Sequence, residues 1–219
     1  MPIRLAILAT LGLALLAAWP AVAEPPPSAG RAACVHAAPT CTSWQARLVA
    51  AASAQVGVTR LYDPAYARIG FPNGDVPRER GVCTDVIIRA YRDAFGLDLQ
   101  TLVNADMKRA FSAYPRRWGL ARPDTNIDHR RVGNLQVYFS RHGQRLPPSR
   151  NPDDFKPGDI ISQMLPGNLP HIAVVSARRG ASGAPEVIHN IGAGVRSEDT
   201  LFAYPITGHY RFAPAADRR

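Results

Sequence analysis

Lysine is almost absent from this sequence, because Lys108 and Lys156 are the two lysines among its 26 basic residues. Arginine therefore supplies nearly all of the formal net charge of +9. A GC-rich base composition explains an arginine bias, and so does attraction to an anionic polymer such as cell wall, lipopolysaccharide or nucleic acid. No recognised nucleic-acid motif accompanies the charge. We therefore expect cell-envelope polymers rather than nucleic acid as partners.

Long hydrophobic runs are missing after residue 23, which argues against a stable membrane anchor. The first residues carry Arg4, then an apolar run over 5–18, then Ala21-Val22-Ala23. A charged start, a short apolar stretch and a small-x-small site are typical of a secretory signal peptide. We expect cleavage after Ala23 and a periplasmic or secreted protein, whose formal charge is +8 without Arg4.

Cysteine is also scarce, with Cys34, Cys41 and Cys83 as the three copies. The first two lie close together in a Pro-rich linker that we place at residues 24–44. In an oxidising compartment they are expected to pair, which stabilises the chain by about 2.5 kcal/mol through loop entropy. Cys83 then remains as an odd thiol, either a buried structural cysteine or a reactive one.

The remaining pattern predicts one α+β domain over residues 45–212, a flexible tail over 213–219 and no internal repeats. Apolar spacing of helical type comes first and short strand-like runs follow it. We expect N-terminal helices packed on an antiparallel β-sheet. The expected helices span residues 42–56, 83–95, 99–114 and 134–142. One expected strand begins at residue 160, and the others cover 171–176, 186–191 and 202–212. The last of these strands contains an expected turn at 207–209.

The stretch from Gly81 to Tyr91 organises the chain, because Cys83 stands where an amphipathic helix begins. At about 100° per residue, Val86, Ile87 and Ala90 share one arc, while Asp85 and Arg89 fall on the opposite arc. At a helix N-terminus, unpaired N–H groups favour a thiolate over a thiol. The sequence therefore predicts a nucleophilic Cys83, held as an ion pair with a histidine before substrate binds.

A nucleophilic cysteine needs a base, and the base needs a third group to orient its ring. His171 opens one expected strand and His189 lies on the next, so the two meet if these strands are neighbours. Alone, each histidine is better explained as an ordinary surface or core residue. A metal site of Cys83 with the histidines is an alternative, but no His-x-x-x-His or Cys-x-x-Cys spacing supports it. We expect no cofactor.

The order Cys83, Pro157-Gly158-Asp159, His171 and His189 resembles the NlpC-type papain-like cysteine peptidases of bacterial cell walls. Three segments, 81–85, 126–131 and 189–192, look like those of an exported bacterial family catalogued as a domain of unknown function within the papain-like group. The resemblance covers 48–212 and implies a papain-like fold. It also implies Cys83 as nucleophile, His171 as base and His189 as orienting residue.

Two departures from that pattern affect the substrate groove. The usual Asp-Cys-Ser-Gly motif is replaced by Val82-Cys83-Thr84-Asp85, and the customary tyrosine lies farther from the cysteine, as Tyr62 or Tyr66. The loop around residues 126–131 has no counterpart in the general pattern. It either binds a substrate carboxylate through bidentate arginine or is a structural salt-bridge loop. The expected substrate-binding residues are Tyr62, Asp128, His129, Arg130 and Arg131.

These observations predict a monomeric exported cysteine hydrolase that cleaves an amide bond in peptidoglycan stem peptides or another envelope peptide. The alternative is a non-catalytic envelope-binding module that keeps the papain-like fold.

Overall fold

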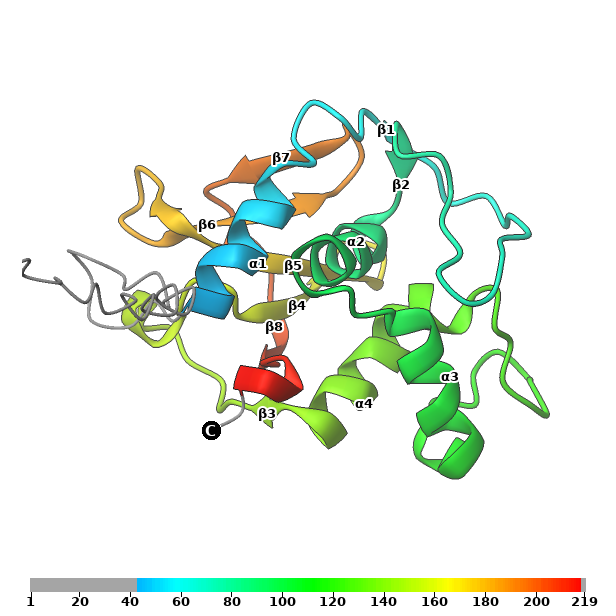
Figure 1. The fold of residues 1–219 in the computed structure, drawn as a ribbon. Coiled ribbons are helices and arrows are strands. Elements are labelled where there is room, and N and C mark those ends of the chain that lie inside the picture. Colours follow the sequence, from blue (N-terminus) through cyan, green and yellow to red (C-terminus); the bar gives the residue numbers. More distant parts are fainter. Residues whose placement is uncertain (1–42, 218–219) are drawn as a thin grey trace, which may run out of the picture. The chain divides into compact units, whose positions relative to one another are not determined.

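The computed structural model describes residues 43–217, which belong to one compact unit of the chain, and Figure 1 shows their arrangement. The predicted signal peptide and the Cys34–Cys41 pair lie outside the described residues. None of the described helices is long and apolar enough to cross a bilayer. The helices are α1 (Ser43–Ser53), α2 (Cys83–Phe95), α3 (Leu99–Arg109) and α4 (Val132–His142), with short 3₁₀ turns at Phe111–Ala113, Asp128–Arg130, Pro152–Asp154 and Ala215–Asp217.

A six-stranded antiparallel sheet follows the helices in the chain. Its order is β3-β8-β4-β5-β6-β7, and a two-stranded parallel pair, β1-β2, precedes α2. This architecture confirms the predicted α+β class. The strands are β1 (Leu61–Tyr62), β2 (Arg80–Gly81), β3 (Gln144–Arg145), β4 (Ile160–Leu165), β5 (Leu169–Arg179), β6 (Pro185–Asn190), β7 (Val195–Glu198) and β8 (Ile206–Arg211).

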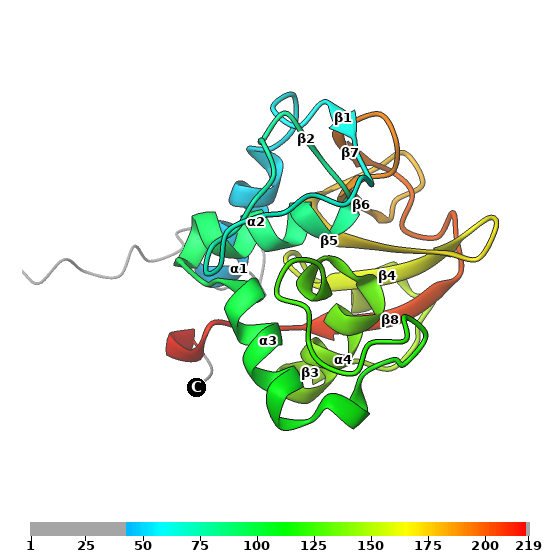
Figure 2. The ribbon, with the colours of Figure 1, turned by 90° about the vertical axis from the view of Figure 1, so that its right-hand side faces the viewer.

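The helices α1, α2 and α4 lie on one face of the sheet, as the turned view shows (Figure 2). Their apolar side chains form the main core with alternate residues of the strands, among them Ile172, Val174 and Ile188. The other sheet face carries a smaller core around Phe155. Loop residues, among them Leu201 and Phe202, pack in this core. Ala173, Val175 and Val187 point to this second face. The sheet is therefore buried on both faces.

Several predicted boundaries are corrected by the structure. The helix α1 begins at Ser43, as expected for the helix over 42–56, but ends earlier, at Ser53, and residues 215–217 form a 3₁₀ turn within the expected tail. The expected turn at 207–209 is wrong, because these residues form β8 and pair with β4, with Gly208 opposite Ser162. Local composition favours a turn there, but a neighbouring strand supplies hydrogen-bond partners for the extended chain.

The helix α2 is buried on all sides along its first nine residues, although its sequence is amphipathic. Arg89 is 1% exposed because its guanidinium binds Asp75 and the backbone carbonyls of Val76 and Arg80. The charged arc of α2 therefore faces other parts of the protein rather than solvent: Arg89 faces the long 63–79 loop, and Asp85 faces Arg130. As expected, the helix ends at Gly96, which adopts the left-handed conformation that glycine accepts without strain.

Candidate active site

Cys83 is the first residue of α2, and its position is fixed by the segment that precedes it. The Asp85 carboxylate accepts a hydrogen bond from the Val82 N–H at 2.7 Å, closing the first turn of the helix. Asn190 on β6 donates its side-chain amide to the Gly81 carbonyl at 3.0 Å. A Cβ on Gly81 would lie 2.9 Å from an Asp85 oxygen, so this position has room for glycine only. The Gly81–Asp85 motif therefore builds the start of the helix and ties it to the sheet.

The Cys83 thiol lies at the end of the sheet next to the start of β5. Its sulfur is surrounded by backbone N–H groups, those of Ile172, Thr84 and Cys83 itself, and each of them lowers the thiol pKa. Ile172 directly follows His171, so the predicted nucleophile lies beside the strand that carries the predicted base. Ile172 faces the helices together with Cys83, whereas the His171 side chain points to the opposite face of the sheet with Ala173, so the two predicted catalytic side chains are not in contact. The cysteine is 5% exposed and is the free cysteine among the described residues.

The two predicted histidines are in direct contact. The Nε2 atom of His171 and the Nδ1 atom of His189 are 2.8 Å apart, and both side chains are buried. His171 shares a sheet face with Ala173, and His189 shares the same face with Val187. The antiparallel pairing of β5 with β6 brings them together, as the sequence predicted if the strands were neighbours.

Glu198 on β7 extends this contact into a chain of three side chains, and no pattern in the sequence pointed to this residue. Its Oε2 atom lies 2.9 Å from the Nε2 atom of His189. Because an ionised carboxylate only accepts hydrogen bonds, His189 must donate from Nε2, and its Nδ1 then accepts from the Nε2–H of His171. The remaining nitrogen of His171, Nδ1, is left with its lone pair free. Glu198 thus sets the tautomers of two histidines.

The resting charge state differs from the predicted ion pair. Burial raises the pKa of the Cys83 thiol to about 12, outweighing the surrounding N–H groups, and the nearby Asp85 carboxylate raises it further. Burial, followed by the neighbouring His189, lowers the pKa of His171 to about 3. Burial also lowers the pKa of His189, against the opposing effect of Glu198. The site therefore holds a neutral thiol and neutral imidazoles, and the predicted resting thiolate is corrected.

A cleft of about 240 Å³ opens beside Cys83. Tyr62 lines it, because the parallel pairing of β1 with β2 places Tyr62 opposite Gly81 and loops out the intervening residues. Tyr62 and Cys83 are therefore close in space although they are far apart in the sequence. Arg130 and Arg131 also line the cleft, together with Arg117 and Trp118, which the sequence analysis did not single out.

The loop around residues 126–131 is mainly structural, which corrects part of the predicted substrate site. Asp128 and His129 are each 2% exposed and do not line the cleft. Arg130 binds Asp85 through two hydrogen bonds of 2.8 Å, so its guanidinium is already occupied. Asn126 donates to the Ala67 carbonyl and accepts from the Ile69 N–H, which anchors the long loop. Of the four predicted loop residues, Arg131 combines a place in the cleft with a partly free guanidinium.

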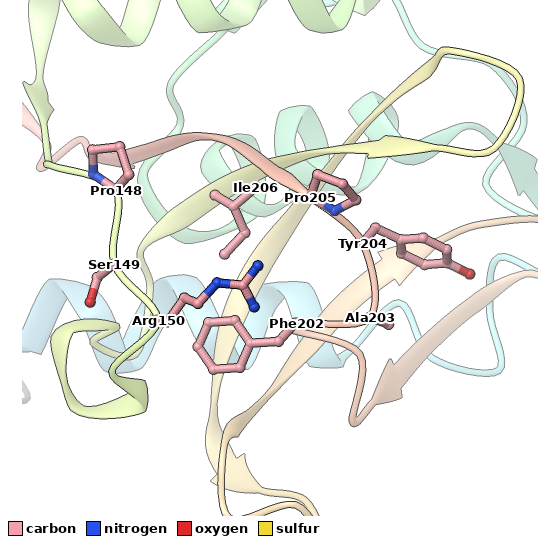
Figure 3. A pocket seen from close by; sticks show the side chains of 8 residues that line it. All are labelled: Pro148, Ser149, Arg150, Phe202, Ala203, Tyr204, Pro205 and Ile206. Carbon is pink, nitrogen blue, oxygen red and sulfur yellow. The ribbon is translucent and has the colours of Figure 1, made fainter.

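A larger cavity, of about 420 Å³, lies elsewhere and contains none of the predicted site residues. It is lined by the 148–150 segment and by 202–206, and Figure 3 shows the Arg150 guanidinium beside the Phe202 ring. No group of three or more His, Cys, Asp or Glu side chains within residues 43–217 is placed to hold a metal ion. The predicted nucleophile, Cys83, lines the smaller cleft, and neither His171 nor His189 lines it.

Comparison with known proteins shows similarity to a bacterial protein and to two solved structures. The Escherichia coli (strain K12) protein named "Uncharacterized protein YijF" is 54% identical over 158 residues, covering 72% of this chain and 77% of that protein. Among solved structures, NlpC1 from Trichomonas vaginalis matches with a TM-score of 0.40 at 15% identity, over 77% of this chain and 44% of that one. NlpC2 from the same organism has a TM-score of 0.37 at 17% identity, over 78% of this chain and 50% of that one. This chain therefore spans half or less of these two solved proteins.

The family described as "Domain of unknown function (DUF1287)" matches residues 49–212, from the second half of α1 to the end of the sheet. This match includes Cys83, both histidines and Glu198. The chain therefore belongs to the DUF1287 family.

Proposed function

We propose that this chain is an exported cysteine hydrolase that cleaves an amide bond in peptidoglycan stem peptides or another cell-envelope peptide. The observation that carries the proposal is the placement of Cys83, at a helix N-terminus and on a cleft, next to a strand whose His171 heads a hydrogen-bonded chain to His189 and Glu198. The signal-peptide pattern and the arginine-rich charge support export and an anionic envelope substrate.

The first half-reaction follows from the neutral resting state. The Cys83 sulfur attacks the amide carbonyl carbon while its proton passes to Nδ1 of His171, and the carbonyl oxygen takes up the negative charge. This step requires the His171 ring to turn from the opposite face of the sheet toward Cys83. Backbone N–H groups at the start of α2 stabilise this oxyanion. His171 then returns the proton to the amide nitrogen as the C–N bond breaks, which leaves a thioester and a free amine.

In the second half-reaction His171 takes a proton from water, and the resulting hydroxide attacks the thioester carbonyl. Collapse of this intermediate breaks the C–S bond, the proton on His171 returns to the Cys83 sulfur, and the carboxylic acid that leaves loses its proton to water. Transient imidazolium at His171 is stabilised through His189 by the Glu198 carboxylate.

The test is incubation of purified sacculi and muropeptides with the wild type and its variants, with products identified by mass spectrometry. Cys83→Ala and His171→Ala are expected to abolish turnover, while His189→Ala retains part of it, because an orienting group contributes less than the base. The double variant Cys83→Ala/His171→Ala should be no worse than either single one, since one catalytic unit is not additive.

His142→Ala is the matched control, because His142 lies on α4 away from the cleft. Melting temperatures of all variants separate loss of chemistry from loss of fold. Product formation by the Cys83→Ala protein would refute the cysteine-hydrolase mechanism.

The buried neutral thiol favours a second candidate function, a non-catalytic module that binds envelope peptides. Both candidates predict co-sedimentation with sacculi, and they differ in chemistry. A binding module leaves muropeptide masses unchanged, and its Cys83→Ala variant binds sacculi as the wild type does.

A further inference from the structure

The cleft beside Cys83 is lined by three arginines and by no aspartate or glutamate. Asp85 and Asp128 lie behind the lining and are 3% and 2% exposed. Asp63, between two lining residues, is paired with Arg80, and the charge of Asp124 acts on Arg131. A substrate that enters the cleft therefore meets guanidinium groups first.

The three arginines differ in how much of their charge is compensated. The charge of Arg130 is compensated by the Asp85 carboxylate, which accepts two hydrogen bonds from its Nε and Nη2 atoms. The Arg131 Nη1 atom is buried 3.6 Å from the Asp128 carboxylate, an ion-pair distance without a hydrogen bond, so Asp128 compensates only part of the Arg131 charge. Arg117 forms no ion pair with any residue in the 43–217 range. Positive charge thus remains uncompensated at Arg117 and in part at Arg131.

Both of these guanidinium groups are held by the same indole ring. The Arg117 and Arg131 Cζ atoms lie 4.6 and 4.2 Å from the centroid of the Trp118 ring, a cation–π distance. Stacking on an indole leaves the edges of a guanidinium, which carry its N–H groups, free to bind an anion. The pair is therefore oriented before any ligand arrives, which reduces the entropy cost of binding.

The start of α4 adds donors to the same wall. Arg131 is the N-cap of this 11-residue helix and offers no side-chain cap, so the first N–H groups of the helix are left without partners inside it. A Cβ at Gly133 would lie 3.4 Å from the Arg117 Nη2 atom, so the backbone of α4 approaches the free guanidinium closely. Arginine side chains and the helix N-terminus act together on an anion.

We propose that Arg117 and Arg131, positioned by Trp118, bind a carboxylate of the substrate in the cleft beside Cys83, so that the substrates are acidic peptides. This inference rests on the proposed function, because it places the carboxylate within the same cleft as the cysteine nucleophile. It assigns a binding role to Arg117 and Trp118 and removes that role from Asp128, His129 and Arg130.

A pair of alkylating reagents tests the local charge without any substrate. Iodoacetate is anionic and iodoacetamide is neutral, and both react with the same Cys83 thiolate. The rate with iodoacetate divided by the rate with iodoacetamide therefore does not depend on the thiol pKa. This ratio reports the electrostatic potential in the cleft. The ratio of the iodoacetate rate to the iodoacetamide rate should be higher for the wild-type protein than for free cysteine. The double variant Arg117→Gln/Arg131→Gln should lower this ratio by about fivefold. Salt at about 1 M should remove most of the preference.

Arg116→Gln is the matched control, because Arg116 is exposed and adjacent in sequence but does not line the cleft. It should leave the rate ratio unchanged. A wild-type ratio equal to that of free cysteine, or a ratio that the double variant does not change, would overturn the proposal.

Ligand binding gives a second readout, which decides the matter if neither reagent reaches the thiol. Acetyl-Ala-Glu and its neutral analogue acetyl-Ala-Gln-amide are titrated into the Cys83→Ala protein and followed by NMR. The acid should bind at least fivefold more tightly than the amide, and the arginine double variant should lose this difference. Equal binding of acid and amide by the Cys83→Ala protein would contradict the proposed site.

Neither readout requires turnover, so the two proposals fail separately. A protein that selects acids but releases no product keeps the carboxylate site and loses the hydrolase function. A protein that cleaves muropeptides without any preference for acids keeps the hydrolase function and loses the site.

Discussion

Glu198 determines which nitrogen of His171 can act as a base. Its carboxylate fixes the tautomer of His189, and His189 in turn engages Nε2 of His171 over a distance of 2.8 Å. Without the carboxylate, His189 is free to adopt either tautomer, and His171 can then carry its proton on Nδ1. The side chain acts through two intervening rings, so we treat Glu198 as a positioning residue.

Replacing Glu198 by glutamine is expected to lower kcat by about 10-fold to 100-fold, because the amide can donate as well as accept and no longer fixes the tautomers. Nitrogen-15 NMR of labelled histidine measures the tautomers directly. Glu186→Gln serves as the control, since Glu186 accepts a hydrogen bond from Ser197 and does not contact either histidine. An unchanged tautomer in Glu198→Gln would disprove the positioning role even if activity fell.

The helix α2 and the 124–131 segment are joined by a buried ion pair between Asp85 and Arg130. Asp85 has two roles, because it accepts from the Val82 N–H at the start of α2 and also binds both Nε and Nη2 of Arg130. Thr84 adds a hydrogen bond to the Arg130 carbonyl at 3.0 Å. The segment thus stabilises the position of Cys83 without contributing Arg130 to the binding of substrate.

Arg130→Ala is therefore expected to reduce the free energy of unfolding by about 3–5 kcal/mol, because it leaves Asp85 buried without its partner. Urea denaturation followed by circular dichroism gives this value. Arg78→Ala is the comparison, since Arg78 pairs with Asp93 at the surface and should cost no more than about 1 kcal/mol. If Arg130→Ala unfolds at the same urea concentration as the wild type, the pair is not structural.

The fold as a whole keeps several histidines buried in their neutral form. Burial lowers the pKa of His129 to about 4 and that of His171 to about 3, and it lowers the pKa of His189 as well. In the unfolded chain these residues return to the ordinary value of 6.5. As the pH falls below 6.5, the unfolded chain therefore binds protons that the folded protein does not.

Stability should consequently decrease as the pH falls from about 6.5 toward 4, by about 1.4 kcal/mol per pH unit for each such histidine. Free energies of unfolding at pH 7 and pH 5 measure the slope. His129→Gln removes one titrating group that does not line the cleft and should make the slope shallower. A protein that is equally stable or more stable at pH 5 would show that these histidines are protonated in the fold.

Local patterns in the sequence determined a large part of this structure. The apolar spacing after Cys83 and the glycine at 96 gave both ends of α2, and the apolar runs containing His171 and His189 gave the strands β5 and β6. These features depend on neighbours within one or two turns of chain, so they are readable from sequence. The candidate nucleophile and base were found in the same way.

The tertiary structure alone decided which side chains complete the site. Glu198 stands on the short β7 strand, which has no apolar alternation, and it reaches His189 because Val187 pairs with Glu198 across two strands. Arg117 and Trp118 reach the cleft from a loop without a regular pattern. Burial also favours a neutral thiol at Cys83, where a thiolate was expected, and Arg130 binds the buried Asp85 rather than facing substrate. Contacts between distant segments and the loss of water around charged groups depend on packing, and neither is encoded in local spacing.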